Sequence, residues 1–135
     1  MQYALGTSDK ISVVTVLPEV LPMINGFITK SGLEKRFAKT CVINMPVLHL
    51  GDIKLLVEAL VDESKKAIEE DGAGAIILGC TAMTGVKEEV EKAIGDGVPV
   101  LESAQSALVM LETFVRMGLN HSRKNYMSPR SKPRT

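Results

Sequence analysis

Residues 75–85 read AIILGCTAMTG, so four apolar residues lead through Gly79 to Cys80 and a polar turn. A short apolar run bounded by turn residues is typical of a strand buried on both faces of a parallel sheet. In such sheets small ligands bind beyond the carboxyl ends of the strands, where N–H groups of the next helix also point. We therefore expect Cys80 to reach a ligand, with these N–H groups and the helix dipole favouring its thiolate form.

Apolar segments rich in β-branched residues alternate with helical patterns along the chain, which is typical of βαβ units. The expected strands are residues 11–16, 40–44, 75–78 and 98–101. Right-handed crossovers arrange four such strands most simply in the order 2-1-3-4. The sequence therefore predicts an α/β fold with a doubly wound four-stranded parallel sheet and helices on both faces. Pro99 places the last strand at an edge or at its own start.

The ends of the helices are marked by capping residues. The most regular helical pattern runs from Asp52, a predicted N-cap, to Gly72. Thr84 and Ser103 are the predicted N-caps of the next two helices, and Gly118 is the predicted C′ residue of the last one. We expect residues 1–119 to form a single α/β lobe. Residues 120–135 are expected to form a basic, unpacked tail, because they contain five Lys or Arg and no acidic residue.

Composition limits the class of protein. The chain has 135 residues, of which 45% are hydrophobic, and its formal net charge is zero. This length suits one domain with a real core, and the absence of a basic stripe with interleaved aromatics argues against nucleic acid as a partner. No apolar run approaches the roughly 20 residues of a membrane helix, and no signal sequence is visible at the start. We expect a cytoplasmic protein whose partner is a small molecule.

Candidate site residues follow from the predicted sheet. The first and third strands are central, so Thr15 and Cys80 are expected on the same rim, where their neighbours Gly79 and Thr81 would also contact a substrate. Cys41 is expected to begin an outer strand, too far from Cys80 for a disulfide, and to be inert. Each residue also has a structural interpretation: a cysteine at a strand end is often a small buried hydrophobe, and threonines often cap backbone groups.

Several segments carry a resemblance to a known family: residues 71–85, 13–15, 45–48 and 118–124. With these segments the chain resembles the aspartate/glutamate/hydantoin racemase superfamily, and its hydantoin racemase branch most closely. Aspartate and glutamate racemases tend to place His or Glu after Gly-Cys-Thr, whereas this chain has Ala82, which favours hydantoin-type substrates. The resemblance implies a racemase that needs no cofactor, with Cys80 as the catalytic acid/base for carbon-acid proton transfer.

The resemblance covers only the second of the family's two similar lobes, each of which supplies one cysteine. We therefore expect a homo-oligomer or a complementing lobe, which would also cover the apolar stripe on the final helix. A single-cysteine decarboxylase of the same superfamily, or a catalytically silent binding or assembly domain, are the alternatives. No metal or cofactor site is expected, because two cysteines and two scattered histidines make a poor zinc site and no phosphate-binding glycine motif is present.

Overall fold

The two central strands of the sheet come from the most apolar segments of the chain. The structure is a computed structural model that describes residues 1–95 and 97–130. Its four strands are β1 (Ile11–Thr15), β2 (Phe37–Val42), β3 (Ala75–Leu78) and β4 (Val100–Glu102). They form one parallel sheet in the order β2-β1-β3-β4, which confirms the predicted topology. Every residue of β1 and β3 is buried, as expected for strands covered on both faces.

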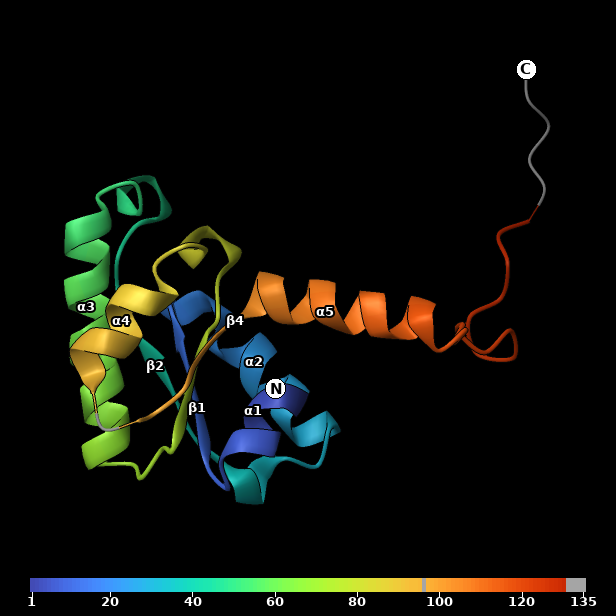
Figure 1. Cartoon of the computed structure of the whole chain (residues 1–135), viewed down its shortest axis with the longest axis horizontal. Coiled ribbons are helices and arrows are strands. Elements are labelled where there is room, and N and C mark those ends of the chain that lie inside the picture. Colours follow the sequence, from blue (N-terminus) through green and yellow to red (C-terminus); the bar gives the residue numbers. More distant parts are fainter. Residues whose placement is uncertain (96, 131–135) are drawn as a thin grey trace.

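Helices cover both faces of this sheet, as predicted (Figure 1). On one face lie α1 (Gln2–Thr7) and α2 (Leu21–Lys30), and on the other α3 (Ile53–Glu69) and α4 (Lys87–Ile94). The helix α1 was not predicted, because it is short and buries only Ala4. Short 3-10 helices at residues 18–20, 34–36, 47–49 and 81–83 complete the connections.

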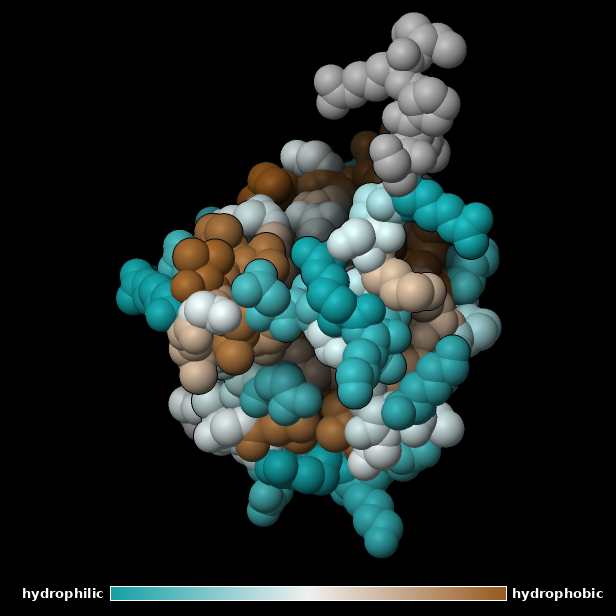
Figure 2. Space-filling view, turned by 90° about the vertical axis from the view of Figure 1, so that its right-hand side faces the viewer, coloured by the Kyte–Doolittle hydropathy of each residue, from teal (hydrophilic) through white to brown (hydrophobic). Residues whose placement is uncertain are grey.

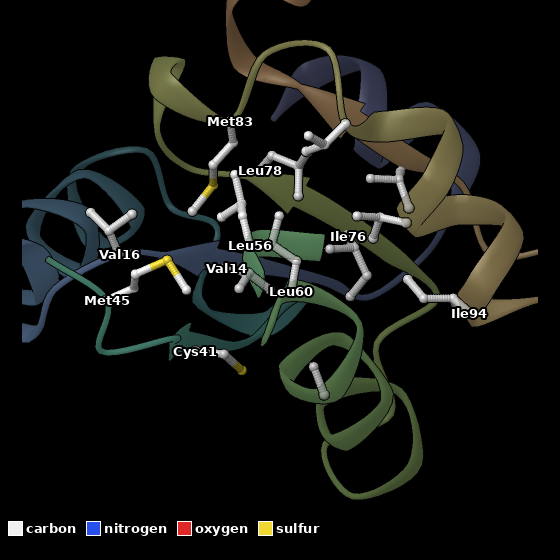
Figure 3. Close-up of a cluster of buried hydrophobic side chains, with 14 of the residues drawn as sticks. Val14, Val16, Cys41, Met45, Leu56, Leu60, Ile76, Leu78, Met83 and Ile94 are labelled. Atoms are coloured by element: carbon white, nitrogen blue, oxygen red, sulfur yellow. The ribbon is translucent and has the colours of Figure 1, made fainter. Parts of the chain in front are cut away.

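The sheet divides the core into two clusters. The larger cluster lies under α3 and α4, where the fully buried Leu56 and Leu60 meet Val14, Ile76 and neighbouring side chains (Figure 3). The smaller one lies under α1 and α2 and contains Ile11, Val13, Ile24, Ile28 and Ile77. Side chains alternate between the two faces along each strand, so the two clusters take alternate residues of β1 and β3.

The second strand begins earlier than the sequence indicates. It spans Phe37–Val42 instead of residues 40–44, and Cys41 therefore lies near its carboxyl end, paired with Val14. The expectation that Cys41 begins this strand is wrong. The reason is that β2 is an edge strand, in which exposed residues such as Lys39 interrupt the apolar pattern.

Only some of the predicted helix caps are found. Asp52 caps α3, since its Oδ1 accepts a hydrogen bond from the Leu55 N–H at 3.2 Å. Thr84 does not cap α4, which begins at Lys87; its hydroxyl instead donates to the Thr81 carbonyl oxygen at 2.7 Å. Ser103 is the first residue of the last helix and makes no capping bond there.

The last helix, α5 (Ser103–Arg116), extends away from the sheet (Figure 1). None of its residues is buried, and the exposed fractions of Leu111 and Val115 are 59% and 81%. Gly118 ends it at φ +65°, with the hydrogen bonds of a Schellman motif from Gly118 to Val115 and from Leu119 to Phe114. Seen from the side to which α5 projects, hydrophobic residues gather in patches between hydrophilic ones (Figure 2).

Residues 120–130 of the predicted basic tail are all exposed, and Lys132 and Arg134 lie outside the described residues. In the part of the chain that the structure covers, no helix combines the length and hydrophobicity needed to cross a bilayer.

Candidate functional site

Cys80 lies immediately beyond the carboxyl end of the central strand β3. Its backbone is extended, at φ −129° and ψ 135°, and the 3-10 turn Thr81–Met83 follows directly. The side chain is half-buried and packs against the cluster on the α3 and α4 face. A thiol at this edge remains accessible while its position is fixed by the sheet, which suits a nucleophile or a proton-transfer group.

Two backbone N–H groups directly after Cys80 are available to an anion. Within residues 1–95 and 97–130, the N–H groups of Thr81 and Ala82 find no hydrogen-bond acceptor, whereas Met83 N donates to the Cys80 carbonyl oxygen at 3.0 Å. The α-helix that was expected to aim its dipole at Cys80 begins only at Lys87. Stabilisation of a negative charge therefore depends on these local N–H groups instead of on a helix terminus.

The start of the turn is held by a close approach of β3 to β1. Gly79 N donates to the Val14 carbonyl oxygen at 2.8 Å. A Cβ atom on Gly79 would lie 2.6 Å from Val13 Cγ1 and 3.5 Å from Thr15 Cβ. The structure therefore brings Gly79 and Thr15 together, as the predicted layout requires, and explains why position 79 needs a glycine.

Thr15 itself is closed off, with an exposed fraction of 2%. Its side chain follows that of Val13 onto the α1 and α2 face, whereas Cys80 packs on the opposite face. A substrate contact through the Thr15 hydroxyl stays a prediction that requires this residue to become accessible. Thr81 is exposed beside Cys80, and its carbonyl oxygen accepts a hydrogen bond from the Thr84 hydroxyl. A substrate contact through Thr81 also stays a prediction.

Two further residues hold the turn, and the sequence reasoning assigned neither of them to the site. Met83 is fully buried, and its side chain points from the turn into the core near Val16 and Leu78 (Figure 3). Glu102, at the end of β4, accepts a hydrogen bond from the Gly85 N–H at 2.7 Å. The sequence carries only a weak signal for Glu102, an acidic residue at the end of an otherwise apolar strand, and this signal does not identify its partner Gly85.

The second cysteine has the properties of a core residue. Cys41 is 4% exposed and lies at the edge of the larger cluster, and both cysteines are free thiols. Burial raises the pKa of the Cys41 thiol above its ordinary value, and the negative charge of Glu63 raises it further. A buried thiol that resists ionisation is a poor nucleophile, in agreement with the expectation that Cys41 is inert.

An apolar cavity of about 440 Å³ lies on the α1 and α2 side of the sheet. Phe27 and Met23 of α2 and Met110 of α5 contribute to its walls, and Gly79 is the only predicted site residue that does so. The cavity has few polar groups and does not contain Cys80. The candidate site is therefore the turn at Cys80, outside this cavity, where a thiol lies next to two N–H groups that have no acceptor among the described residues.

Known proteins of similar sequence match most of this chain. The family model described as Asp/Glu/Hydantoin racemase matches residues 1–111. The hydantoin racemase of Rhizobium meliloti is 36% identical over 134 residues, which are 98% of this chain and 55% of that protein. The hydantoin racemase of Pseudomonas sp. (strain NS671) is also 36% identical, over 91% of this chain and 49% of its own length.

Solved structures show the same likeness. The allantoin racemase from Pseudomonas fluorescens superimposes with a TM-score of 0.88 at 34% sequence identity, over 99% of this chain and 57% of that one. The allantoin racemase from Klebsiella pneumoniae gives the same TM-score at 29% identity, with 99% and 55% of the two chains covered. The chain thus spans about half the length of the relatives and structures it matches.

Proposed function

Because the chain belongs to the Asp/Glu/hydantoin racemase family, we propose that it forms one lobe of a racemase acting on five-membered cyclic ureides. Hydantoin and allantoin, the substrates in the names of its relatives, share such a ring. The observation that carries the proposal is the half-buried Cys80 at the carboxyl edge of β3, next to the unoccupied N–H groups of Thr81 and Ala82.

In the proposed reaction, the Cys80 thiolate removes the proton from the ring carbon beside a carbonyl group. The S–H bond forms, the C–H bond breaks, and its electron pair moves into the carbonyl to give a planar enolate. The N–H groups of Thr81 and Ala82 donate to the enolate oxygen, where the negative charge develops. The adjacent carbonyl acidifies the carbon, so the proposal assigns no step to a metal or organic cofactor.

Inversion requires a second acid on the opposite face of the ring, because Cys80 serves one face only. We propose that a complementing lobe or a second copy of the chain supplies it. This part of the proposal is supported by α5, whose apolar residues Leu108, Leu111 and Val115 are exposed. A helix with no buried residue forms a face suited to covering by another polypeptide.

The proposal is tested by incubating one enantiomer of a 5-substituted hydantoin with the protein in heavy water. Deuterium incorporation and optical rotation are followed together. Incorporation with retention indicates that Cys80 exchanges the proton on one face, and incorporation with loss of rotation indicates a complete site. Cys80→Ser is expected to abolish incorporation, whereas Cys41→Ser, the matched control, retains it because Cys41 is buried in β2, away from the turn that carries Cys80.

Equal incorporation by the wild type and by Cys80→Ser would contradict a catalytic role for this cysteine. The exposed face of α5 would then favour the second function, that of a binding or assembly domain that keeps the fold without catalysis. Loss of carbon dioxide from a disubstituted malonate, measured on the same samples, would identify a single-cysteine decarboxylase instead.

A further inference from the structure

Glu102 is an acidic side chain held inside the protein at the end of the edge strand β4. Its exposed fraction is 8%, and its Oε1 accepts a hydrogen bond from the Gly85 N–H at 2.7 Å. In the described part of the chain no Lys, Arg or His forms an ion pair with it. A buried carboxylate is costly unless it is hydrogen-bonded, so this contact compensates for the burial.

The register of the sheet places Glu102 beside the turn that carries Cys80. Glu102 pairs with Leu78, the last residue of β3, and Cys80 follows two residues later in the chain. The carboxylate reaches past this point to Gly85, which ends the turn at φ +92°. A backbone at this φ favours glycine, and its N–H is available for a side-chain acceptor instead of a helical carbonyl.

The turn from Gly79 to Gly85 is therefore anchored at both ends and in the middle. Gly79 donates to the backbone of β1, Gly85 donates to Glu102 on β4, and Met83 is fully buried between them. The free N–H groups of Thr81 and Ala82 lie between the first anchor and Met83. They belong to the short 3-10 helix Thr81–Met83, and their direction depends on these anchors because the next α-helix begins only at Lys87.

We propose that Glu102 is a positioning residue that fixes the turn carrying Cys80 and aims the Thr81 and Ala82 N–H groups at the developing oxyanion. The inference rests on the proposed function of Cys80, but the position of the turn is measurable without it. Glu102 does not touch the reacting atoms, and its effect on the reaction passes through the backbone of residues 80–85.

Glu91 of α4 provides a matched control, because its side chain also bonds to a backbone N–H group of β4, the strand that contains Glu102. Its Oε1 accepts a hydrogen bond from the Val100 N–H at 3.2 Å, so it also joins a carboxylate to a backbone N–H near β4. The Glu91 bond connects α4 to the first residue of β4. The Glu102 bond connects the turn of residues 79–85 to the last residue of β4. Loss of either bond lowers the free energy of unfolding, but only loss of the Glu102 bond increases the mobility of the turn.

The test compares Glu102→Ala, Glu102→Gln and Glu91→Ala by amide hydrogen exchange of residues 81–85 and by the steady-state kinetics of deuterium incorporation into the hydantoin. For Glu102→Ala we expect exchange in the turn to rise about tenfold and kcat to fall about tenfold with a smaller change in KM. In Glu102→Gln the amide oxygen can accept the hydrogen bond from Gly85, so we expect kcat and exchange in the turn to stay within about threefold of the wild-type values. Glu91→Ala lowers Tm and leaves kcat and exchange in the turn unchanged.

Equal values of kcat and of exchange at residues 81–85 in Glu102→Ala and Glu91→Ala would overturn the proposal and leave Glu102 a stabilising residue only. If Glu102→Ala does not fold, Glu102→Asp takes its place, because a side chain shorter by one methylene withdraws the carboxylate from Gly85. Failure of the proposed function is recognised separately: the wild type then incorporates no deuterium, and the exchange data alone decide whether Glu102 holds the turn.

Discussion

The Gly79 N–H donates to the Val14 carbonyl oxygen at 2.8 Å, and this bond draws the end of β3 against β1 just before Cys80. A side chain at position 79 has no space there. Its Cβ would lie 2.6 Å from Val13 Cγ1 and 3.1 Å from the Val14 carbonyl oxygen itself, and a backbone oxygen in a sheet cannot move aside. The position of the cysteine therefore depends on a residue without a side chain one position earlier.

Gly79→Ala is expected to lower the free energy of unfolding by about 1–3 kcal/mol, because the added methyl overpacks the contact between the two central strands. Urea denaturation followed by circular dichroism measures the change. Gly26→Ala is the control: Gly26 lies inside α2, and nothing stands within 4 Å of its Cβ position. There alanine should stabilise the helix by about 0.5–1 kcal/mol. An equally stable Gly79→Ala would show that β1 and β3 are not in close contact.

The two cysteines are expected to react at different rates with iodoacetamide in the native protein. Cys80 is half-buried at the edge of the sheet, whereas Cys41 is 4% exposed and its pKa is raised by burial. Alkylation of Cys80 should be at least about tenfold faster, and in urea both thiols should be modified. Mass spectrometry of the tryptic peptides measures the two rates. Faster modification of Cys41 would contradict the placement of both residues.

The raised pKa of Cys41 predicts a specific dependence of stability on pH. The folded protein holds the Cys41 proton to a higher pH than the unfolded chain, whose thiol titrates near the ordinary value of 9.0. Above that pH the unfolded state binds fewer protons, so this contribution to stability is complete below pH 9.0 and is lost as the pH rises beyond it. The slope is at most about 1.4 kcal/mol per pH unit.

The same dependence should be absent from Cys41→Ala, which cannot titrate. Urea denaturation at a series of alkaline pH values measures both proteins, and the difference between their slopes gives the contribution of Cys41 alone. Parallel slopes would show that the folded protein does not retain the Cys41 proton.

The order of the strands was predictable because β1 and β3 are short, fully buried and rich in apolar and β-branched residues, and because crossovers between parallel strands are right-handed. The bounds of β2 were not predictable, since β2 is an edge strand in which the exposed Lys39 interrupts the pattern of apolar residues. Cys80, Gly79 and Thr81 could be proposed as site residues from local sequence, and their roles stay predictions. Glu102 could not, since its partner Gly85 is 17 residues away and only the fold brings them together.

Substitutions of two leucines test whether α5 makes few packing contacts with the rest of the protein. Leu60 of α3 is 0% exposed and Leu111 of α5 is 59% exposed, although both lie on amphipathic helices. Leu60→Ala should lower the free energy of unfolding by about 2–5 kcal/mol, because it leaves a cavity in the larger core cluster. Leu111→Ala should change it by less than about 0.5 kcal/mol in dilute solution, because the side chain already contacts water.

Urea denaturation at two protein concentrations separates folding from association for the same pair of variants. If a second copy of the chain covers α5, the free energy of unfolding of the wild type should increase at the higher protein concentration. For Leu111→Ala this increase should be absent. Leu60→Ala should still show the increase, because the cavity it creates lies under α3 and not on α5. A large cost of Leu111→Ala in dilute solution would contradict the free α5, since it would require this helix to pack against its own sheet.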